Sequence, residues 1–241
     1  MKIISCIFSP LFALTFFLIL LVFHPLQWIG LQLGYAAHKR TVDLLNWCLT
    51  HSLLIIGNTV CFKHTHPMPE NTSLIFVANH QSLFDIPPLI WYLRKHHAKF
   101  VAKSELARGI PSVSFNLRHG GAALIDRKNK QQALEKLKQF GQRIHNHKWS
   151  AIIFPEGTRS RSGILGTFKL DGLKTIVEQN SHASIVPISI NNSWKVFKYG
   201  AFPFGMFHRI TIKTHKPLNL KNADLQRVFS DMESIISARV N

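Results

Sequence analysis

The longest apolar stretch of the chain lies close to its start. Residues 3–23 carry no charged side chain, and about 20 apolar residues are what a helix needs to cross the core of a bilayer. Pro10 falls inside this run, which membrane helices tolerate. The pattern predicts an apolar, membrane-spanning helix over residues 3–23. A helical hairpin within one leaflet is the main alternative. A cleaved signal peptide is disfavoured because the run is long and only Lys2 provides a basic start.

A second and weaker apolar run covers residues 42–62. It predicts an amphipathic helix over about residues 40–57 that lies at the membrane interface and is followed by a strand. The run is too polar for a confident span, because it contains Asp43, Asn46, His51 and Asn58. Residues 1–60 therefore read as a membrane-associated helical segment.

Residues 61–241 show a different pattern, in which short β-rich runs alternate with stretches of helical period. This alternation predicts an α/β domain with a mixed, largely parallel sheet flanked by helices. Helices are expected over residues 84–94, 129–145, 168–179 and 223–240, and strands over residues 73–79, 98–103, 121–126, 150–155, 183–190 and 209–214.

The charge of the chain narrows the choice of partners. Lys and Arg number 29 against 12 Asp and Glu, a formal net charge of +17. Such a chain suits nucleic acid, anionic lipid or phosphorylated small molecules. No aromatic-and-basic stripe, helix-turn-helix or zinc signature is visible, so no nucleic-acid partner is expected. Lys39 and Arg40 follow the first apolar segment, which places the basic domain in the cytoplasm by the positive-inside rule.

Cysteine and histidine add little to this picture. The three cysteines have no metal-ligand spacing, and the histidine runs lack an accompanying set of acid or cysteine ligands. No metal site is expected.

Polar residues gather where the predicted strands end, which is where α/β sheets bind ligands. In "NHQSLFD", His80 follows a strand and Asp85 comes five residues later. At a strand–turn–helix junction, Asp85 can fold back to accept the Nδ1–H of His80 and leave Nε2 free to take a proton from a hydroxyl. Ser82 and Asp85 also fit a helix capping box, in which Asp85 would serve only the backbone.

Two further junctions carry cations. Arg127 ends the strand in "IDRK", and Arg159 and Arg161 follow the Pro-Glu-Gly turn in "FPEGTRSRSG". The guanidinium is a planar fork of donors suited to phosphate. The alternative for each is an ordinary surface arginine.

Four blocks of the sequence, in order, resemble the glycerolipid acyltransferases, and most of all their 1-acyl-glycerol-3-phosphate acyltransferase branch. These blocks are "NHQSLFD", "GAALIDR", "FPEGTRS" and "IVPISI", and "AKSEL" resembles the stretch between the first two. The likeness covers roughly residues 71–191. The first and third blocks are specific, whereas the second and fourth would be weak alone.

The resemblance implies direct acyl transfer from acyl-CoA or acyl carrier protein to the free hydroxyl of lysophosphatidate, giving phosphatidate for phospholipid biosynthesis. It implies neither an acyl-enzyme nor any metal or cofactor beyond the thioester co-substrate. His80 would be the general base and Asp85 its orienting partner. The residues expected to bind substrate are Lys103, Arg127, Glu156, Gly157, Thr158 and Arg159, with Glu156 fixing the shape of the turn or the position of Arg159.

Membrane lipid is an expected partner, and the expected location is the cell inner (cytoplasmic) membrane with the catalytic domain on its cytoplasmic face. Another acceptor remains open, such as a lysophospholipid, a lyso-ornithine lipid or glycerol 3-phosphate. A noncatalytic lipid-binding protein is the alternative from another class.

Overall fold

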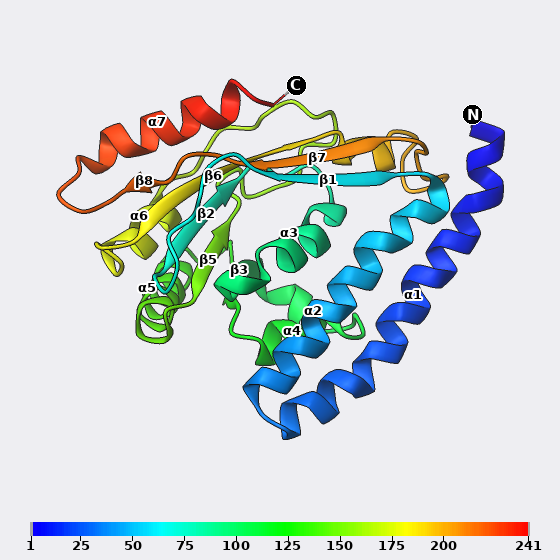
Figure 1. Cartoon of the computed structure of the whole chain (residues 1–241), viewed down its shortest axis with the longest axis horizontal. Helices are drawn as coiled ribbons and strands as arrows, with labels where there is room; N and C mark the ends of the chain where they lie inside the picture. Colours follow the sequence, from blue (N-terminus) through cyan, green and yellow to red (C-terminus); the bar gives the residue numbers. More distant parts are fainter. Residues whose placement is uncertain (1, 241) are drawn as a thin grey trace.

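The computed structural model describes residues 2–240. It begins with two long helices, α1 (Lys2–Gln32) and α2 (Tyr35–Ser52), which form a hairpin around Gly34 (Figure 1). Gly34 has φ +102°, a backbone conformation that suits glycine. Helix α1 runs beyond the predicted end at residue 23 because it accommodates Pro25 as well as Pro10. Helix α2 begins earlier than the predicted residue 40, and a 3-10 turn, Leu53–Ile56, replaces its predicted end.

The rest of the chain is built on an eight-stranded sheet with the order β1-β7-β6-β2-β5-β3-β4, in which β8 pairs with β6. All pairings are parallel except those of β6 with β7 and with β8. The prediction of a mixed, largely parallel sheet flanked by helices is therefore confirmed. The strands are β1 (Thr59–His64), β2 (Leu74–Ala78), β3 (Ala98–Lys103), β4 (Ala123–Ile125), β5 (Ser150–Ile153), β6 (Ser184–Asn191), β7 (Arg209–Thr214) and β8 (Leu218–Asn219).

Five further helices connect and cover the strands. Four of them match predicted helices, with ends that differ by a few residues, and α4 was not predicted. They are α3 (Ile86–Tyr92), α4 (Val113–His119), α5 (Lys130–His147), α6 (Asp171–Glu178) and α7 (Leu225–Ser237).

Strand β2 shows how the layers meet, because its five residues are all buried. Ile75 and Val77 pack into the apolar cluster that contains residues of α5, α6 and α7. Phe76 points to the other face, into a cluster that contains residues of α3 and Phe12 of α1. A strand buried on both faces is typical of the centre of a parallel sheet. Helix α1 is thus part of the core of the domain, because Phe12 is 1% exposed.

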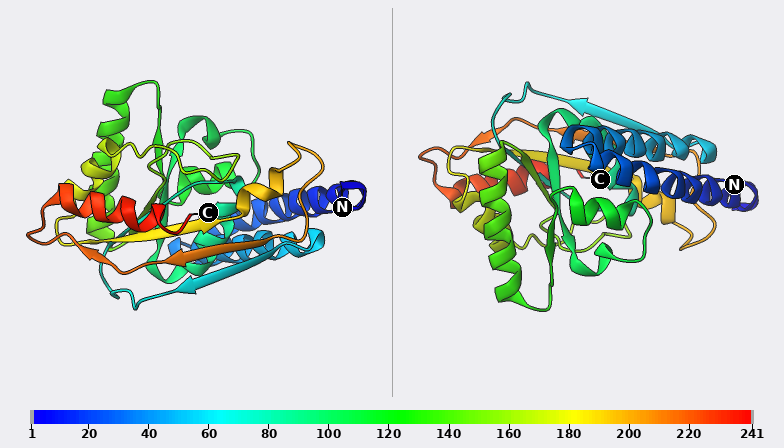
Figure 2. Two further views of the ribbon diagram at one scale, coloured as in Figure 1. Left: turned by 90° about the horizontal axis from the view of Figure 1, so that it is seen from above. Right: turned by 90° about the horizontal axis from the view of Figure 1, so that it is seen from below.

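Helix α1 has two contrasting faces. Among the described residues it is the helix long and apolar enough to cross a membrane, yet one face packs on the domain over most of its length (Figure 2). Near its start the hydroxyl of Ser9 accepts a hydrogen bond from the amide of Phe204 at 2.8 Å. Past its middle, the carbonyl of Leu20 accepts a hydrogen bond from the Ser112 hydroxyl at 2.6 Å. The opposite face exposes Ile3, Ile7, Leu11, Leu14, Leu18, Leu21, Val22, Leu26 and Ile29.

Candidate active site

The turn that follows β2 is tied to the neighbouring strand β6. The side chain of Asn79 donates to the carbonyl of Ile190 at 2.9 Å and accepts from the amide of the same residue at 2.7 Å. This double hydrogen bond fixes the chain just before His80. The position of the imidazole is therefore set by the sheet rather than by a free loop.

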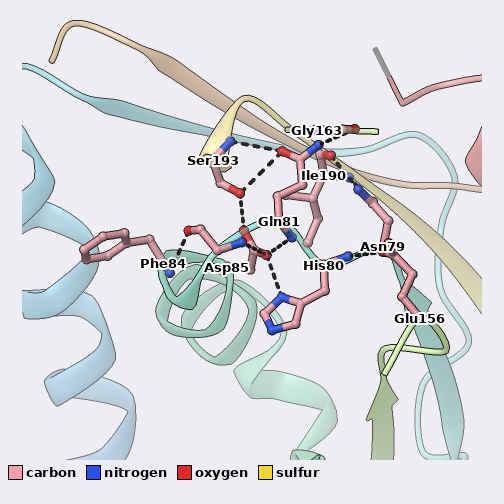
Figure 3. A network of polar contacts seen from close by, with 10 residues as sticks. Asn79, His80, Gln81, Phe84, Asp85, Glu156, Gly163, Ile190 and Ser193 are labelled. Atoms are coloured by element: carbon pink, nitrogen blue, oxygen red, sulfur yellow. Dashed lines mark hydrogen bonds and ion pairs between the residues drawn. The ribbon is translucent and has the colours of Figure 1, made fainter. Parts of the chain in front are cut away.

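His80 and Asp85 lie in contact, as their spacing predicted. The His80 Nδ1 is 2.8 Å from Oδ2 of Asp85 (Figure 3). The same oxygen accepts from the amides of Gln81 at 2.7 Å and Ser82 at 2.9 Å, while the Ser82 hydroxyl accepts from the amide of Phe84 at 3.0 Å. The capping box and the imidazole contact are therefore both present, although the sequence presented them as alternatives.

The two side chains differ in their exposure to solvent. Asp85 is fully buried, whereas the His80 side chain keeps 16% of its surface exposed. The ring of Phe154 stacks on the imidazole with 4.1 Å between centroids and 14° between planes. With Nδ1 held by the carboxylate and one face covered, the accessible nitrogen of His80 is Nε2.

The sequence-based prediction gives Glu156 two possible roles among the substrate-binding residues, fixing the shape of the turn or the position of Arg159, and its contacts fit the first. Its side chain is buried, with one oxygen accepting from the amide of His80 at 2.6 Å and the other from the amide of Gly166 at 2.8 Å. Within residues 2–240 it makes no ion pair with Arg159. Burial raises the pKa of Glu156, and the two backbone hydrogen bonds oppose that rise. Its role is to hold the backbone of the turn against His80.

The cations lie at the same edge of the sheet as His80. The carboxyl ends of the parallel strands β2, β5, β3 and β4 share that edge, and they are followed or ended by His80, the Phe154–Arg159 segment, Lys103 and Arg127 respectively. Arg127 donates through its guanidinium to the carbonyl of Gly157, whose φ of +68° closes the turn. The side chains of Lys103, Arg127, Thr158 and Arg159 are exposed.

One cavity of about 670 Å³ joins these residues to the helical hairpin. His80, Lys103, Arg127, Gly157, Thr158 and Arg159 all line it. The rest of its wall is largely apolar and includes Phe16 and Leu20 of α1, Val42, Leu45 and Leu49 of α2, and Ile90 and Phe100. The hairpin therefore forms one wall of the cavity that opens at the His80 imidazole.

The other end of the cavity is polar. Lys39 and Asp43 form an ion pair at 2.5 Å, and the Lys99 ammonium lies 5.0 Å from the ring centre of Tyr35 and 4.5 Å from that of Trp149. Burial lowers the pKa of Lys99 to about 8, with the charge of Lys39 adding to the effect. Lys103 lies four residues after Lys99 along β3, a rise of about 13 Å. The cavity is therefore long enough for a substantial hydrocarbon chain.

Sequence reasoning missed several parts of this site. Ser193, Gln81 and Phe154 all contact the His80–Asp85 pair directly or through one hydrogen bond. Gln81 and Phe154 lie inside the recognised blocks, but an amide and an apolar ring do not by themselves indicate a catalytic or binding role. Ser193 lies 108 residues from Asp85, so no local pattern could connect them.

A buried Asp85 bonded to the imidazole of His80, exposed cations and an apolar cavity at the carboxyl edge of a parallel sheet fit an α/β enzyme that acts on an anionic amphiphile. The comparison with known families makes this specific. The model of the Acyltransferase family matches residues 59–191, and the chain belongs to this family.

Three comparisons illustrate the likeness. The chain is 25% identical to a 1-acyl-sn-glycerol-3-phosphate acyltransferase of Cocos nucifera over 238 residues, which cover 97% of this chain and 72% of the relative. It is 35% identical to the Helicobacter pylori protein of the same name over 126 residues, or 51% of this chain and 50% of that relative. The crystal structure of PlsC from Thermotoga maritima, a 1-acyl-sn-glycerophosphate acyltransferase, superposes with a TM-score of 0.74 at 22% identity, covering 98% and 93% of the two chains. This likeness shows that the two proteins share a fold. The chain spans 42% of the length of a chloroplast relative from Arabidopsis thaliana.

Proposed function

We propose that this protein transfers a fatty acyl group from a thioester to the free hydroxyl of lysophosphatidate, giving phosphatidate. The observation that carries the proposal is the 2.8 Å contact between His80 Nδ1 and Asp85 at the mouth of an apolar cavity. The names of the relatives support the same acceptor, because each reported homologue is called a 1-acyl-sn-glycerol-3-phosphate acyltransferase.

The chemistry follows from the tautomer that Asp85 selects. With the proton of the neutral imidazole on Nδ1, Nε2 accepts the proton of the acceptor hydroxyl as its oxygen attacks the thioester carbonyl. The carbon–sulfur bond then breaks, and the thiolate leaves and takes up the proton from the imidazolium. A free thiol has a pKa of about 8.5, so the leaving group needs little acid assistance. Transfer is direct and needs no acyl-enzyme.

The acceptor phosphate is proposed to bind Arg127 and Arg159, with Lys103 as a further cation. All three line the cavity on the side of His80, and guanidinium groups bind phosphate through paired hydrogen bonds. The Gly157–Thr158 backbone lies beside them. The hydrocarbon chain would occupy the apolar part of the cavity, because each CH₂ left in water costs about 0.8 kcal/mol.

The donor is proposed to be acyl-CoA or acyl carrier protein, and the enzyme is proposed to work on the cytoplasmic face of the inner membrane. We further propose that the α1–α2 hairpin lies in one leaflet instead of spanning the bilayer. Helix α1 supports this arrangement, because Phe12, Ser9 and Leu20 contact the domain along one face while the opposite face is exposed and apolar. A spanning α1 would have to leave those contacts or draw the domain into the lipid.

The proposal is tested with the purified full-length chain in lipid vesicles. Lysophosphatidate, other lysophospholipids, a lyso-ornithine lipid and glycerol 3-phosphate are offered with matched CoA and carrier-protein thioesters. The expected result is the highest kcat/KM with lysophosphatidate, loss of turnover in His80→Ala, and a raised acceptor KM in Arg159→Ala. Preference for an uncharged acceptor would refute the assignment, and absence of turnover with every pair would favour a noncatalytic lipid-binding protein.

A further inference from the structure

Ser193 lies on the side of Asp85 opposite to His80 (Figure 3). It begins the 3-10 turn Ser193–Phe197, which follows β6, and it is fully buried. Asn192 just before it has φ +68°, a left-handed conformation that Asn tolerates better than most residues. This bend turns the chain away from β6 and brings the Ser193 hydroxyl against the carboxylate.

The hydroxyl of Ser193 donates a hydrogen bond to Oδ1 of Asp85. The other carboxylate oxygen, Oδ2, is already occupied by the His80 ring and by the amides of Gln81 and Ser82. Both oxygens of Asp85 are thus assigned to fixed partners from opposite sides. The plane of the carboxylate, and with it the direction of the His80 ring, depends on both sets of bonds.

The side chain of Gln81 holds the backbone of Ser193 in place. Its side-chain oxygen accepts from the amide of Ser193 at 3.2 Å, and its side-chain nitrogen donates to the carbonyl of Gly163 at 3.5 Å. The amide group of Gln81 is therefore held at both ends and keeps its acceptor toward Ser193. The Ser193 hydroxyl has two acceptors within reach, Oδ1 of Asp85 and, at 3.5 Å, Oε1 of Gln81, and the contact with Asp85 is the shorter one.

We propose that Ser193 is a positioning residue that completes a Ser193–Asp85–His80 hydrogen-bond chain and keeps the imidazole correctly aimed for acyl transfer. The inference rests on the proposed function, because it assigns Ser193 a role in that same reaction. It adds a residue that lies outside the four recognised sequence blocks.

The physical effect of the hydroxyl has a definite sign. The positive end of its O–H dipole lies against the carboxylate and stabilises the charged form of Asp85. Removing it makes the potential at the pair more negative, so every proton on the pair binds more tightly. The charged groups that face the pair are Glu156, whose carboxylate accepts from the His80 amide, and Lys103, Arg127 and Arg159 in the cavity. All four are unchanged by a substitution at Ser193.

The experiment compares Ser193→Ala with Ser73→Ala in the full-length chain. Ser73 is a matched control, since its buried hydroxyl also donates one hydrogen bond, to the carbonyl of Ile144 at 3.1 Å, at the opposite end of β2. A hydrogen bond to a charged group implies a fall in kcat of about 10- to 100-fold for Ser193→Ala. The acceptor KM should stay within about twofold of wild type, and the acid limb of the kcat/KM profile should move to higher pH.

Ser193→Thr and Ser193→Cys extend the test if Ser193→Ala is poorly folded. Threonine keeps the hydroxyl donor and should restore most of kcat, while cysteine, a weak donor, should fall between serine and alanine. Equal kcat in Ser193→Ala and Ser73→Ala, or a kcat loss with an unmoved acid limb, would overturn the inference. Failure of the wild type to turn over any acceptor would instead refute the proposed function. The same assay therefore distinguishes failure of this inference from failure of the proposed function.

Discussion

At the scale of single residues, Oδ2 of Asp85 accepts hydrogen bonds from the His80 ring and from the amides of Gln81 and Ser82. One oxygen thus closes the turn and orients the imidazole. Because the turn is anchored to the sheet through Asn79, the imidazole is held on a rigid element. A substitution that keeps the shape of Asp85 but removes its charge tests what the carboxylate contributes to turnover.

Asp85→Asn is such a substitution. The Asn oxygen, placed where Oδ2 of Asp85 lies, can still accept from the two backbone amides and from His80, but it carries no negative charge. We expect a folded protein whose kcat falls roughly 10³–10⁴-fold, because the imidazolium that forms during transfer loses its counter-charge. Steady-state kinetics check this, with Asp224→Asn as the control, since Asp224 caps α7 by accepting from the amide of Gln226 at 3.0 Å. Near-normal turnover in Asp85→Asn would mean that Asp85 serves only as a cap for the helical turn that follows Ser82.

Lys99→Met tests how much a desolvated ammonium group at this position lowers the stability of the folded protein. The pKa of Lys99 is lowered from its ordinary value of 10.5 to about 8. Between these two pH values the unfolded chain binds a proton at this residue and the folded chain does not, so wild-type stability should rise with pH there. We expect the variant to be more stable than wild type at pH 7, by on the order of 1–3 kcal/mol after the loss of the ring contacts.

The measurement is unfolding of both proteins at pH 7 and pH 9.5. The stability gap should narrow at the higher pH, where wild-type Lys99 is largely neutral in the folded state. Lys138→Met, at an exposed position of α5, should show no such narrowing. A gap that is constant with pH would mean that Lys99 is not buried as a cation.

The distance between partners decides which parts of the site could be predicted from the sequence. His80 and Asp85 are five residues apart, so a local pattern was enough to bring them together. The resemblance places Glu156 in the turn before Arg159, but it does not show that the partners of this carboxylate are the backbone amides of His80 and Gly166. Backbone partners and pairings over a hundred residues, such as that of Ser193 with Asp85, leave no trace in sequence spacing.

At the scale of elements, the crossing of α1 and α2 depends on Gly30. A Cβ built on Gly30 would lie 3.0 Å from the Thr41 hydroxyl oxygen and 3.1 Å from the Cα of His38. The lack of a side chain therefore lets the two helices approach closely. Close packing here holds α2, and with it the α2 side of the cavity, against α1.

Gly30→Val should push the two helices apart. Overpacking of this kind costs about 1–3 kcal/mol, which should appear as a lower midpoint of thermal unfolding in detergent. The control is Ile29→Val, since Ile29 is exposed on the other face of the same helix. An unchanged midpoint for Gly30→Val would show that the hairpin adjusts without strain.

The sequence predicted helices and strands correctly where the apolar pattern was strong. It missed α4, a helix that is held in place by polar contacts. Strands β3 and β7 have the predicted bounds, because both are continuous β-rich runs. The apolar residues of α4, Val113, Phe115 and Leu117, alternate with polar ones instead of following helical period, and the segment before it is held to α1 by polar bonds. The amide of Ser112 donates to Nδ1 of His24 at 3.0 Å, and its hydroxyl donates to Leu20. Such tertiary hydrogen bonds stabilise a short helix that its local sequence does not predict.

At the scale of the whole molecule, the net charge of +17 and the apolar outer face of α1 favour a single arrangement at the membrane. In the proposed arrangement the apolar face enters the leaflet, and the basic domain stays close to anionic head groups. A hairpin in one leaflet and a spanning helix differ in how deep the middle of α1 lies.

Depth can be measured with a fluorophore on single cysteines at positions 8, 17 and 28, in a chain from which Cys6, Cys48 and Cys61 have been replaced. Phe8, Phe17 and Trp28 are all exposed on α1. A spanning helix places position 17 near the bilayer centre and the other two about 14–16 Å away toward opposite surfaces. A hairpin in one leaflet keeps all three depths within about 15 Å of one surface.

Lipid-borne quenchers at two depths provide the readout, and a label at position 138 on α5 serves as the control that stays in water. Deep quenching confined to position 17 would refute the one-leaflet arrangement.

The cavity wall contributed by Phe16, Leu20, Val42, Leu45 and Leu49 has a kinetic consequence. If the hairpin lies in the leaflet as proposed, a fatty chain can pass from the bilayer interior into the cavity without being hydrated. The encounter of enzyme and substrate is then two-dimensional, and the effective substrate concentration is its mole fraction in the surface. Diluting the acceptor with inert lipid, at a fixed amount per volume of buffer, should slow the enzyme in proportion.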